Sequence, residues 1–165
     1  MTEQEIQQKH HRALRDALGQ FATGVTIITT SDAQGAPVGL TVNSFNSVSL
    51  DPPLVLWSLM NSSGKLDVFS RCTHWAVHVL GVDQQALSQR FASSCDRFAG
   101  IDFTRGAGNV PLLEGCVARY VCSNHLQHEG GDHRILIGRV EQFEQFSGEP
   151  LLFHGGHYCQ LGNTL

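Results

Sequence analysis

The sequence predicts a mostly β fold with short helices, arranged as an antiparallel, Greek-key-like barrel that is either closed or split. Runs of β-branched residues recur along the chain, and turn residues separate them. Strands do not alternate regularly with crossover helices, as a doubly wound parallel sheet would require. Two long strand-like segments flank a Glu-Gly-Gly-Asp turn at residues 129–132, which is typical of a hairpin. At 165 residues, the chain has the length of one domain.

The N-terminal residues are expected to lie outside the barrel. They are polar and glutamine-rich, so we expect residues 1–12 to form a flexible segment ahead of a single domain over residues 13–165. Thr2 and Glu5 have the spacing of a capping box, which is a weak sign of a helix start. A helix over residues 10–18 is predicted by apolar residues at i, i+4 and i+7, which are Leu14, Leu18 and Phe21.

A strand pair is predicted to follow this helix. Residues 25–30 are β-branched throughout, and turn residues at 32–37 indicate a hairpin into a second strand over 38–43. One face of that second strand is apolar and carries Val38, Leu40 and Val42. The opposite face carries small or hydrogen-bonding residues, Gly39, Thr41 and Asn43. Because a solvated face would more often carry Lys or Glu, we interpret this face as a candidate ligand surface.

The rest of the chain supplies shorter elements and then a long hairpin. The middle elements are expected in this order: a short strand ended by Asp51-Pro52-Pro53, a fully buried strand over 54–59, a short helix opened by loop 61–65, and an alternating strand over 75–79. Asp83 is expected to be the N-cap of a helix that runs through Phe91. The last segments are an irregular region at 93–112, two long strands over 115–127 and 133–144, and a short strand or coil over 151–158.

The composition argues against several classes of protein. Charged residues make up 16% of the chain, and a net charge of −4 argues against a broad phosphate-backbone footprint for nucleic acid. The apolar runs are far shorter than the roughly 18 residues that cross a bilayer, and no signal-peptide pattern is visible. The five cysteines form no Cys-x-x-Cys pair, which argues against a zinc ribbon or a disulfide framework. We therefore expect a cytoplasmic protein with no nucleic-acid or membrane partner.

A polar cluster at residues 39–49, GLTVNSFNSVS, is the first candidate site. Its hydroxyl and amide side chains are those of Thr41, Asn43, Ser44, Asn46, Ser47 and Ser49. Such groups, together with free backbone N–H groups, can bind a planar heterocycle or a phosphate. The alternative is that this Ser/Asn-rich loop satisfies its own backbone. The residues alone leave both interpretations open.

Loop 61–65, Asn-Ser-Ser-Gly-Lys, is a candidate anion site. Ser62, Ser63 and Lys65 would offer two hydroxyls and one ammonium at a helix start, where free N–H groups also favour an anion. Ordinary N-capping by Ser62 or Ser63 is the alternative. Lys65 favours the anion interpretation, because the chain has so few lysines.

Other chemistries find less support in the sequence. His125, His128 and His133 lie near the predicted hairpin turn, but no i, i+4 histidine pair on a helix and no cysteine partner points to a metal site. No Gly-x-Ser-x-Gly elbow occurs, and no cysteine lies in a helix-start motif that would lower its pKa. Walker A and Gly-x-Gly-x-x-Gly fingerprints are also absent from the sequence.

Six segments between Phe21 and Tyr158 carry sequence motifs whose order along the chain is informative. They are FATGVTIITT, PVGLTVNSFNSVSLDPPLVLWSL, WAVHVL, QRFASSCDRFAG, GGDHRILIGRV and PLLFHGGHY. In this order they resemble the flavin reductase family, whose members supply reduced flavin to two-component monooxygenases. The triplet Gly131-Asp132-His133, followed by Gly138 and Val140, matches the family's pyridine-nucleotide signature.

The resemblance implies an FMN-binding split barrel that works as a homodimer, with flavin near the subunit interface. It implies that NADH or NADPH reduces FMN or FAD by direct hydride transfer, without an acid–base pair, and that a separate monooxygenase receives the reduced flavin. His133 would position the nicotinamide. The flavin would be held by Thr41, Asn43, Ser44, Ser47, Ser62, Ser63, Lys65, Phe91, Arg97 and Tyr158. Loop 61–65 departs from each known family version of that loop.

Two alternatives stay open beside the reductase. The same fold occurs in pyridoxamine phosphate oxidases and in non-catalytic FMN-binding or electron-transfer proteins, and fold resemblance alone does not fix the reaction. A non-catalytic protein would not need the Gly-Asp-His signature. A pure interaction module is the third hypothesis, and it predicts a colourless purified protein.

Overall fold

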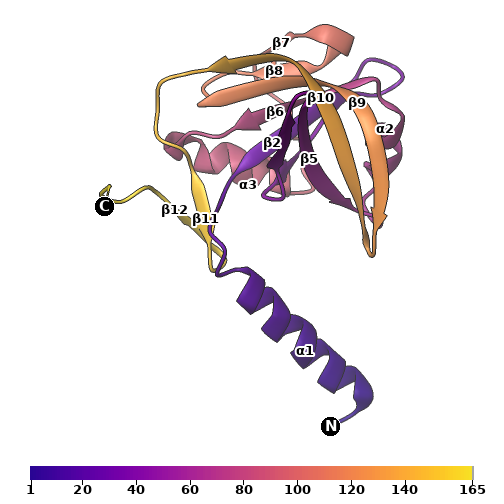
Figure 1. Cartoon of the computed structure of the whole chain (residues 1–165), viewed down its shortest axis with the longest axis vertical. Coiled ribbons are helices and arrows are strands. Elements are labelled where there is room, and N and C mark those ends of the chain that lie inside the picture. The colour runs from indigo at the N-terminus through magenta and orange to yellow at the C-terminus, as the bar shows by residue number, and fades with distance from the viewer. Residues whose placement is uncertain (165) are drawn as a thin grey trace.

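The computed structural model describes residues 1–164 and contains a curved antiparallel sheet of seven strands in the order β3-β2-β6-β9-β10-β5-β4 (Figure 1). Its strands are β2 Thr26–Ser31, β3 Pro37–Val42, β4 Asn46–Leu50, β5 Pro53–Met60, β6 His74–Val79, β9 Ala118–Gly130 and β10 His133–Gln145. Strands β3 and β4 are its two edges, so the barrel is split. The structure thus confirms the predicted mostly β, antiparallel split barrel.

Short sheets and helices accompany the seven-stranded sheet. Two short sheets are made by β7 Phe103–Arg105 with β8 Pro111–Leu113, and by β1 Thr23–Gly24 with β11 Leu152–His154 and β12 His157–Cys159. The helices are α1 Glu3–Leu18, α2 Leu66–Arg71 and α3 Gln85–Ala92, with 3-10 turns η1 Val82–Gln84 and η2 Ala107–Asn109. Within residues 1–164, no helix is long and apolar enough to cross a membrane.

The long hairpin forms as the sequence predicts, and aromatic side chains fill the barrel core. β9 and β10 pair from His133–Gly130 to Gln145–Ala118, and Gly131 in the turn has φ 72°. Inside the barrel, the Trp57 ring packs edge-on against Phe69 at 5.0 Å and against Trp75 at 6.0 Å between ring centroids. All three side chains are fully buried. This aromatic cluster fixes α2 against the sheet, because Phe69 of the helix is buried in the core and Leu66 packs against it.

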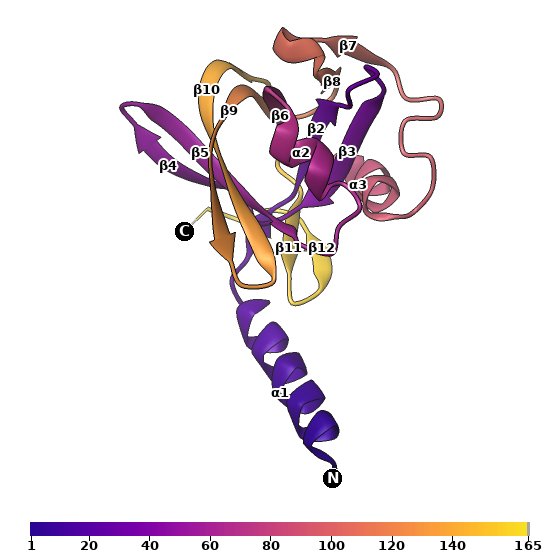
Figure 2. The same cartoon turned by 90° about the vertical axis from the view of Figure 1, so that its right-hand side faces the viewer.

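Helix α1 begins at Glu3, seven residues before the predicted start at residue 10. The capping box is present: Thr2 Oγ1 accepts from the Glu5 N–H at 3.2 Å, and the Glu5 carboxylate accepts from the Thr2 N–H at 2.6 Å. These two bonds satisfy orphan N–H groups and extend the helix. The helix projects from the barrel and buries none of its residues (Figures 1 and 2). The proposed boundary between residues 1–12 and 13–165 stays a prediction.

Three local predictions need correction. Strand β5 is not fully buried: Val55, Trp57 and Leu59 face the core, whereas alternate residues are half-buried, because only one face of the strand packs inward. Asp83 does not cap α3, since the 3-10 turn η1 precedes the helix and Gln84 accepts from the Gly81 N–H instead. Residues 93–112 are not wholly irregular, because they include β7, η2 and the first part of β8.

Candidate functional site

A cationic pocket lies where α2 begins. Lys65 is the residue before this helix, and Arg97 reaches the same pocket of about 460 Å³ from the loop after α3. Burial lowers the pKa of the Lys65 ammonium, and the nearby positive charge of Arg97 lowers it further. Asp96 also lines the pocket, where its carboxylate accepts from the Phe98 N–H at 3.2 Å. Two cations beside one carboxylate leave a net positive charge, which suits an anionic group such as a phosphate.

Arg97 is held in place by backbone carbonyl groups. Its Nη1 donates to Gly39 O at 2.9 Å, and its Nε donates to Ser93 O at 2.8 Å. Gly39 also lies against α3, since a Cβ there would sit 2.8 Å from the Phe91 ring. The guanidinium therefore links β3 to the segment after α3 and forms a fixed wall of the pocket.

Three elements meet at Ser88 of α3. Thr41 Oγ1 donates to Ser88 O at 2.6 Å, and the Ser88 and Tyr158 hydroxyls share a hydrogen bond of 2.9 Å. Ser88 thus joins two predicted site residues, Thr41 and Tyr158. Ser88 itself is not among the predicted site residues. Helix α3 covers part of the β3 face that we interpreted as a ligand surface. Ser88 gave no signal of its own, because a serine in a helix is common.

Phe91 occupies the core rather than a ligand surface. Its ring is fully buried and packs edge-on against Phe98 at 4.9 Å. Direct contact between Phe91 and a flavin would require the neighbouring segment to move. The position of the ring favours a role in shaping the wall behind Gly39.

A groove of about 890 Å³ lies at the other end of β3. Asn43 and Ser44 line it, together with the C-terminal end of α1, Phe153 and the Gly155-Gly156 turn. Ser44 Oγ accepts from the Ser58 N–H at 2.9 Å and donates to Ser58 O at 3.2 Å, so its hydroxyl joins β5 to the end of β3. Here the backbone-satisfying interpretation describes Ser44, whereas the exposed Asn43 side chain faces solvent.

The cationic pocket and the groove lie at opposite ends of strand β3, so the length of the strand gives the distance between them. Gly39 lies beside the cationic pocket and Asn43 beside the groove, four residues further on. At about 3.3 Å per residue, this separation is about 13 Å. An elongated ligand with a phosphate at one end and a flat ring at the other fits these dimensions. This is the shape of FMN.

Ser47 lies apart from both of these places. It is exposed on β4 and lines a different, largely apolar groove of about 870 Å³ with Phe45, Leu50 and Phe143. The structure of one chain does not bring Ser47 to the residues around Gly39. A site at the interface of two chains is the arrangement in which Ser47 could take part.

The turn that carries His133 is hydrogen-bonded to loop 61–65. The Asn61 N–H donates to Asp132 O at 2.9 Å, and Asn61 Nδ2 donates to Gly131 O at 3.0 Å. His133 Nδ1 lies 2.7 Å from Asp132 Oδ1, a hydrogen bond that lowers the pKa of the Asp132 carboxyl. The His133 side chain is 40% exposed, so a ligand can reach its ring. Asn61 was included in the predicted loop, but its role as a tether between the two motifs was not predicted.

The two serines of loop 61–65 differ in their contacts. Ser63 Oγ accepts from the Lys65 N–H at 3.3 Å, whereas Ser62 is exposed. Neither side chain caps α2, whose N-cap is Lys65 with no side-chain cap bond. The N-capping alternative is therefore wrong for this helix. A phosphate role for these serines stays a prediction.

Comparison with known proteins gives a consistent assignment. The family described as the flavin reductase like domain matches residues 18–162. The chain is 45% identical over 150 residues to the FMN reductase (NADH) SmoA of Agrobacterium fabrum, covering 91% of this chain and 86% of that protein.

Solved structures agree with this match. One is a nitrilotriacetate monooxygenase component B homologue from Mycobacterium thermoresistibile, with TM-score 0.91, 38% identity, and 96% and 92% of the two chains covered. Another is the Streptomyces globisporus NADH:FAD oxidoreductase SgcE6 in complex with NAD and FAD fragments, with TM-score 0.88, 36% identity, and 93% and 94% covered. The chain therefore belongs to the flavin reductase like domain family.

Proposed function

We propose that this protein is an NAD(P)H:flavin oxidoreductase that transfers a hydride from nicotinamide to FMN or FAD and supplies the reduced flavin to a partner monooxygenase. The observation that carries the proposal is the pair of Asn61 hydrogen bonds, which fasten the His133 turn to the loop that ends in Lys65. A residue suited to nicotinamide and a residue suited to flavin phosphate thereby belong to one connected structure. The relatives named as NADH-dependent FMN and FAD reductases support the same reaction.

The side chains of this protein have few chemical tasks in such a reaction. A bound flavin supplies the hydride acceptor, at its N5 atom. Lys65 and Arg97 would bind the phosphate, and the bonds from Arg97 to Gly39 and Ser93 keep its charge in position without ligand. His133 would orient the carboxamide or diphosphate of NAD(P)H by hydrogen bonding. Its bond to Asp132 Oδ1 holds the ring and leaves Nε2 for the ligand.

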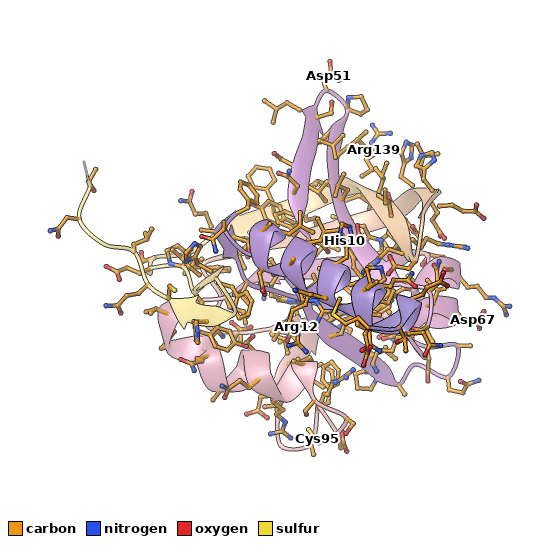
Figure 3. The ribbon with its side chains drawn as sticks, turned by 90° about the horizontal axis from the view of Figure 1, so that it is seen from below. His10, Arg12, Asp51, Asp67, Cys95 and Arg139 are labelled. Atoms are coloured by element: carbon orange, nitrogen blue, oxygen red, sulfur yellow. The ribbon has the colours of Figure 1, made fainter. Side chains whose placement is uncertain are left out.

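The working unit that we propose is a cytoplasmic homodimer. Hairpin β4–β5 extends from the barrel, with Asp51 at its tip (Figures 2 and 3). Next to Asp51, Leu50 is 95% exposed, and Phe143 across the apolar groove is 74% exposed. Large exposed apolar side chains around one groove are typical of a protein–protein interface. Ser47 lies in this groove, which supports a flavin site near the interface.

Steady-state oxidation of NADH and NADPH tests the proposed activity. We expect oxidation to depend on added FMN or FAD, and the flavin to be reduced when oxygen is excluded. Flavin binding without NAD(P)H oxidation would instead identify a non-catalytic FMN-binding or electron-transfer protein. A protein that neither binds flavin nor oxidises NAD(P)H would leave only the interaction module.

A further inference from the structure

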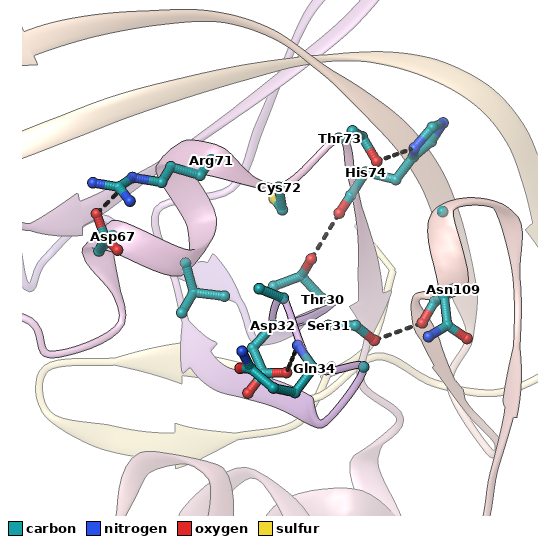
Figure 4. Close-up of a pocket in the computed structure, with 14 residues that line it drawn as sticks. Thr30, Ser31, Asp32, Gln34, Asp67, Arg71, Cys72, Thr73, His74 and Asn109 are labelled. Carbon is teal, nitrogen blue, oxygen red and sulfur yellow. Dashed lines mark hydrogen bonds and ion pairs between the residues drawn. The ribbon is translucent and has the colours of Figure 1, made fainter.

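A further cavity, of about 710 Å³, lies along helix α2, between Asp67 and Cys72 (Figure 4). It is enclosed by one side of α2, the β2–β3 turn at residues 32–35, the start of β6 and the 3-10 turn η2. None of the residues that the sequence analysis singled out for flavin or nicotinamide lines it. The reaction proposed above gives it no role.

The walls of this cavity are braced without a ligand. Arg105 Nη1 donates to Ser31 Oγ at 2.6 Å and to Asn109 O at 2.8 Å, and its Nη2 donates to Gly35 O at 3.1 Å. Ser31 Oγ also donates to Asn109 O at 2.6 Å, as Figure 4 shows. These bonds join the β2–β3 turn to η2, so the cavity is pre-formed.

Hydrogen-bond acceptors and apolar atoms share the lining. Asp32 Oδ1 accepts from the N–H groups of Gln34 at 2.9 Å and Ala36 at 2.8 Å. Its other oxygen, Oδ2, accepts no hydrogen bond from any residue between 1 and 164. Val68 and Cys72 line the helix side of the cavity. An apolar wall beside a free carboxylate oxygen suits a flat ring that carries N–H or O–H donors.

The charged side chains that line the cavity disfavour an anion there. Asp32 and Asp67 line it with a single guanidinium, Arg71, which pairs with Asp67 at 2.9 Å. A neutral group with donors is the complementary ligand. An adenosine has this chemistry, because its ribose diol and exocyclic amine both donate, and a carboxylate that accepts from a ribose hydroxyl is a recurrent device in dinucleotide sites.

The cavity and the cationic pocket adjoin. Both are lined by Val68, and strand residues Thr30 in the cavity and Val38 in the pocket are register partners. Helix α2 has six residues, so its ends are about 9 Å apart. A ligand whose phosphates lie against Lys65 and Arg97 can therefore extend along α2 and reach Asp32.

We propose that this cavity binds the adenosine half of a dinucleotide whose diphosphate lies against Lys65 and Arg97. The proposal rests on the proposed function, since it gives that site its second half. FAD carries this adenosine and FMN does not, and because Lys65 and Arg97 hold the flavin phosphate, the dinucleotide is FAD rather than NAD(P)H. We therefore expect the protein to bind FAD, the dinucleotide form of the flavin, more tightly than FMN, the mononucleotide form.

The test compares Asp32→Asn with Asp102→Asn. The amide of Asp32→Asn keeps one oxygen for the Gln34 and Ala36 N–H groups and loses the carboxylate acceptor at Oδ2. Asp102 is an exposed carboxylate that lines neither this cavity nor the cationic pocket, and it serves as the matched control. Fluorescence titration measures FAD and FMN affinity, and steady-state kinetics measure the KM for NADH.

We expect Asp32→Asn to weaken FAD by about tenfold, the loss of one charge-assisted hydrogen bond, and to leave FMN within about twofold. Ala33→Trp, at an exposed position on the cavity rim, should weaken FAD in the same way by filling the space. Free adenosine should displace FAD but not FMN. If the KM for NADH rises while both flavin affinities stay constant, the cavity serves the pyridine nucleotide and the proposed FAD site is wrong.

Equal weakening of FMN and FAD would overturn the proposal, because Asp32 would then act on the fold. No change in FAD affinity or in the KM for NADH with either cavity variant would also overturn it. Either result would overturn the adenosine site alone, because the wild-type protein would still reduce flavin with NAD(P)H. Loss of the proposed function is recognised separately, by a wild-type protein that neither binds FMN nor oxidises NAD(P)H.

Discussion

At the scale of single residues, the site depends on charge that the fold concentrates. The whole chain has a net charge of −4, yet one of its two lysines lies beside Arg97 in one pocket. Burial lowers the pKa of Lys65, and the positive charge of Arg97 lowers it further, so keeping both cations there costs energy without an anion between them. Such an arrangement is what a phosphate would relieve.

Replacement of Lys65 by alanine should therefore separate FMN from riboflavin, which lacks the phosphate. A charge-assisted contact contributes about 1.5–3 kcal/mol, so we expect FMN affinity to fall about tenfold or more. Riboflavin affinity should change little. Lys9→Ala, on exposed α1, is the control. Fluorescence titration measures both ligands, and equal weakening of the two would remove Lys65 from the phosphate site.

His133 should act on the pyridine nucleotide and leave the flavin alone. Removing its ring in His133→Ala deletes one contact of about 1–3 kcal/mol, which lowers kcat/KM for NAD(P)H by roughly 5- to 150-fold. The KM should rise because the contact is made on binding. Stopped-flow reduction of the flavin-loaded variant measures this effect. His128→Ala, exposed on the same hairpin, is the control, and an unchanged NAD(P)H dependence for His133→Ala would exclude His133 from the site.

At the scale of elements, local patterns predict the long strands but not the short strands β7 and β8, nor the contacts between elements. The β9–β10 hairpin was predictable because side-chain alternation and a Gly-Gly turn both act over a few residues. An apolar run such as 54–59 has no such signal of which face is buried, so β5 was predicted fully buried and proved half-buried. The first two turns of α1 were missed because their residues are polar and only a capping box marks them.

The candidate site divides in the same way, into local motifs that the sequence predicts and tertiary contacts that it does not. Loop 61–65 and the Gly-Asp-His turn are each local motifs and were found as such. Their junction through Asn61, and the approach of Arg97 to Lys65, depend on tertiary packing that periodicity does not encode. Ser88 was missed for this reason, since its role exists only where α3 crosses β3.

The glycine in β10 tests how closely the strands of the barrel pack. A Cβ on Gly138 would lie 2.4 Å from Trp75 Cζ2 and 2.9 Å from Cys122 Cβ, in the fully buried core. Gly138→Ala must therefore displace an indole ring, and we expect the free energy of unfolding to fall by about 1–3 kcal/mol. Urea denaturation measures this change. Gly24→Ala, whose Cβ meets nothing within 4 Å, should cost far less, and equal costs for both variants would contradict the packing argument.

At the scale of the whole molecule, the barrel leaves apolar surface that a second copy would cover. Phe143 is 74% exposed and lines the groove beside hairpin β4–β5. A charge there would be buried without a partner in a dimer, but would stay solvated in a monomer. We therefore expect Phe143→Glu to convert a wild-type dimer into a folded monomer, measured by light scattering and circular dichroism. Asp102→Asn, an exposed change at a residue that does not line the groove, should stay dimeric. A dimeric Phe143→Glu would show that another surface pairs.

The stability of the whole barrel should depend on pH through one buried histidine. His78 is fully buried, its Nδ1 lies 3.1 Å from Ile27 O, and its Nε2 accepts from the Leu113 N–H at 3.0 Å. The ring is therefore neutral and joins β6 to β2 and β8. Burial lowers the pKa of His78 to about 4. The hydrogen bond to Ile27 O acts in the opposite direction and raises the pKa, whereas the positive charge of Arg119 lowers it.

The sign of this effect follows from proton binding. Above pH 6.5 the ring is neutral in both the folded and unfolded states, whereas between pH 6.5 and about 4 only the unfolded chain takes up the proton. The free energy of unfolding should therefore fall as the pH is lowered through this window, by a total on the order of 3 kcal/mol from this one group. Urea denaturation at several pH values measures the slope. His78→Gln, which offers an amide to the same two backbone groups and cannot titrate, should lose this part of the slope, whereas His128→Ala should keep it. A slope that His78→Gln leaves unchanged would assign the acid sensitivity to other groups.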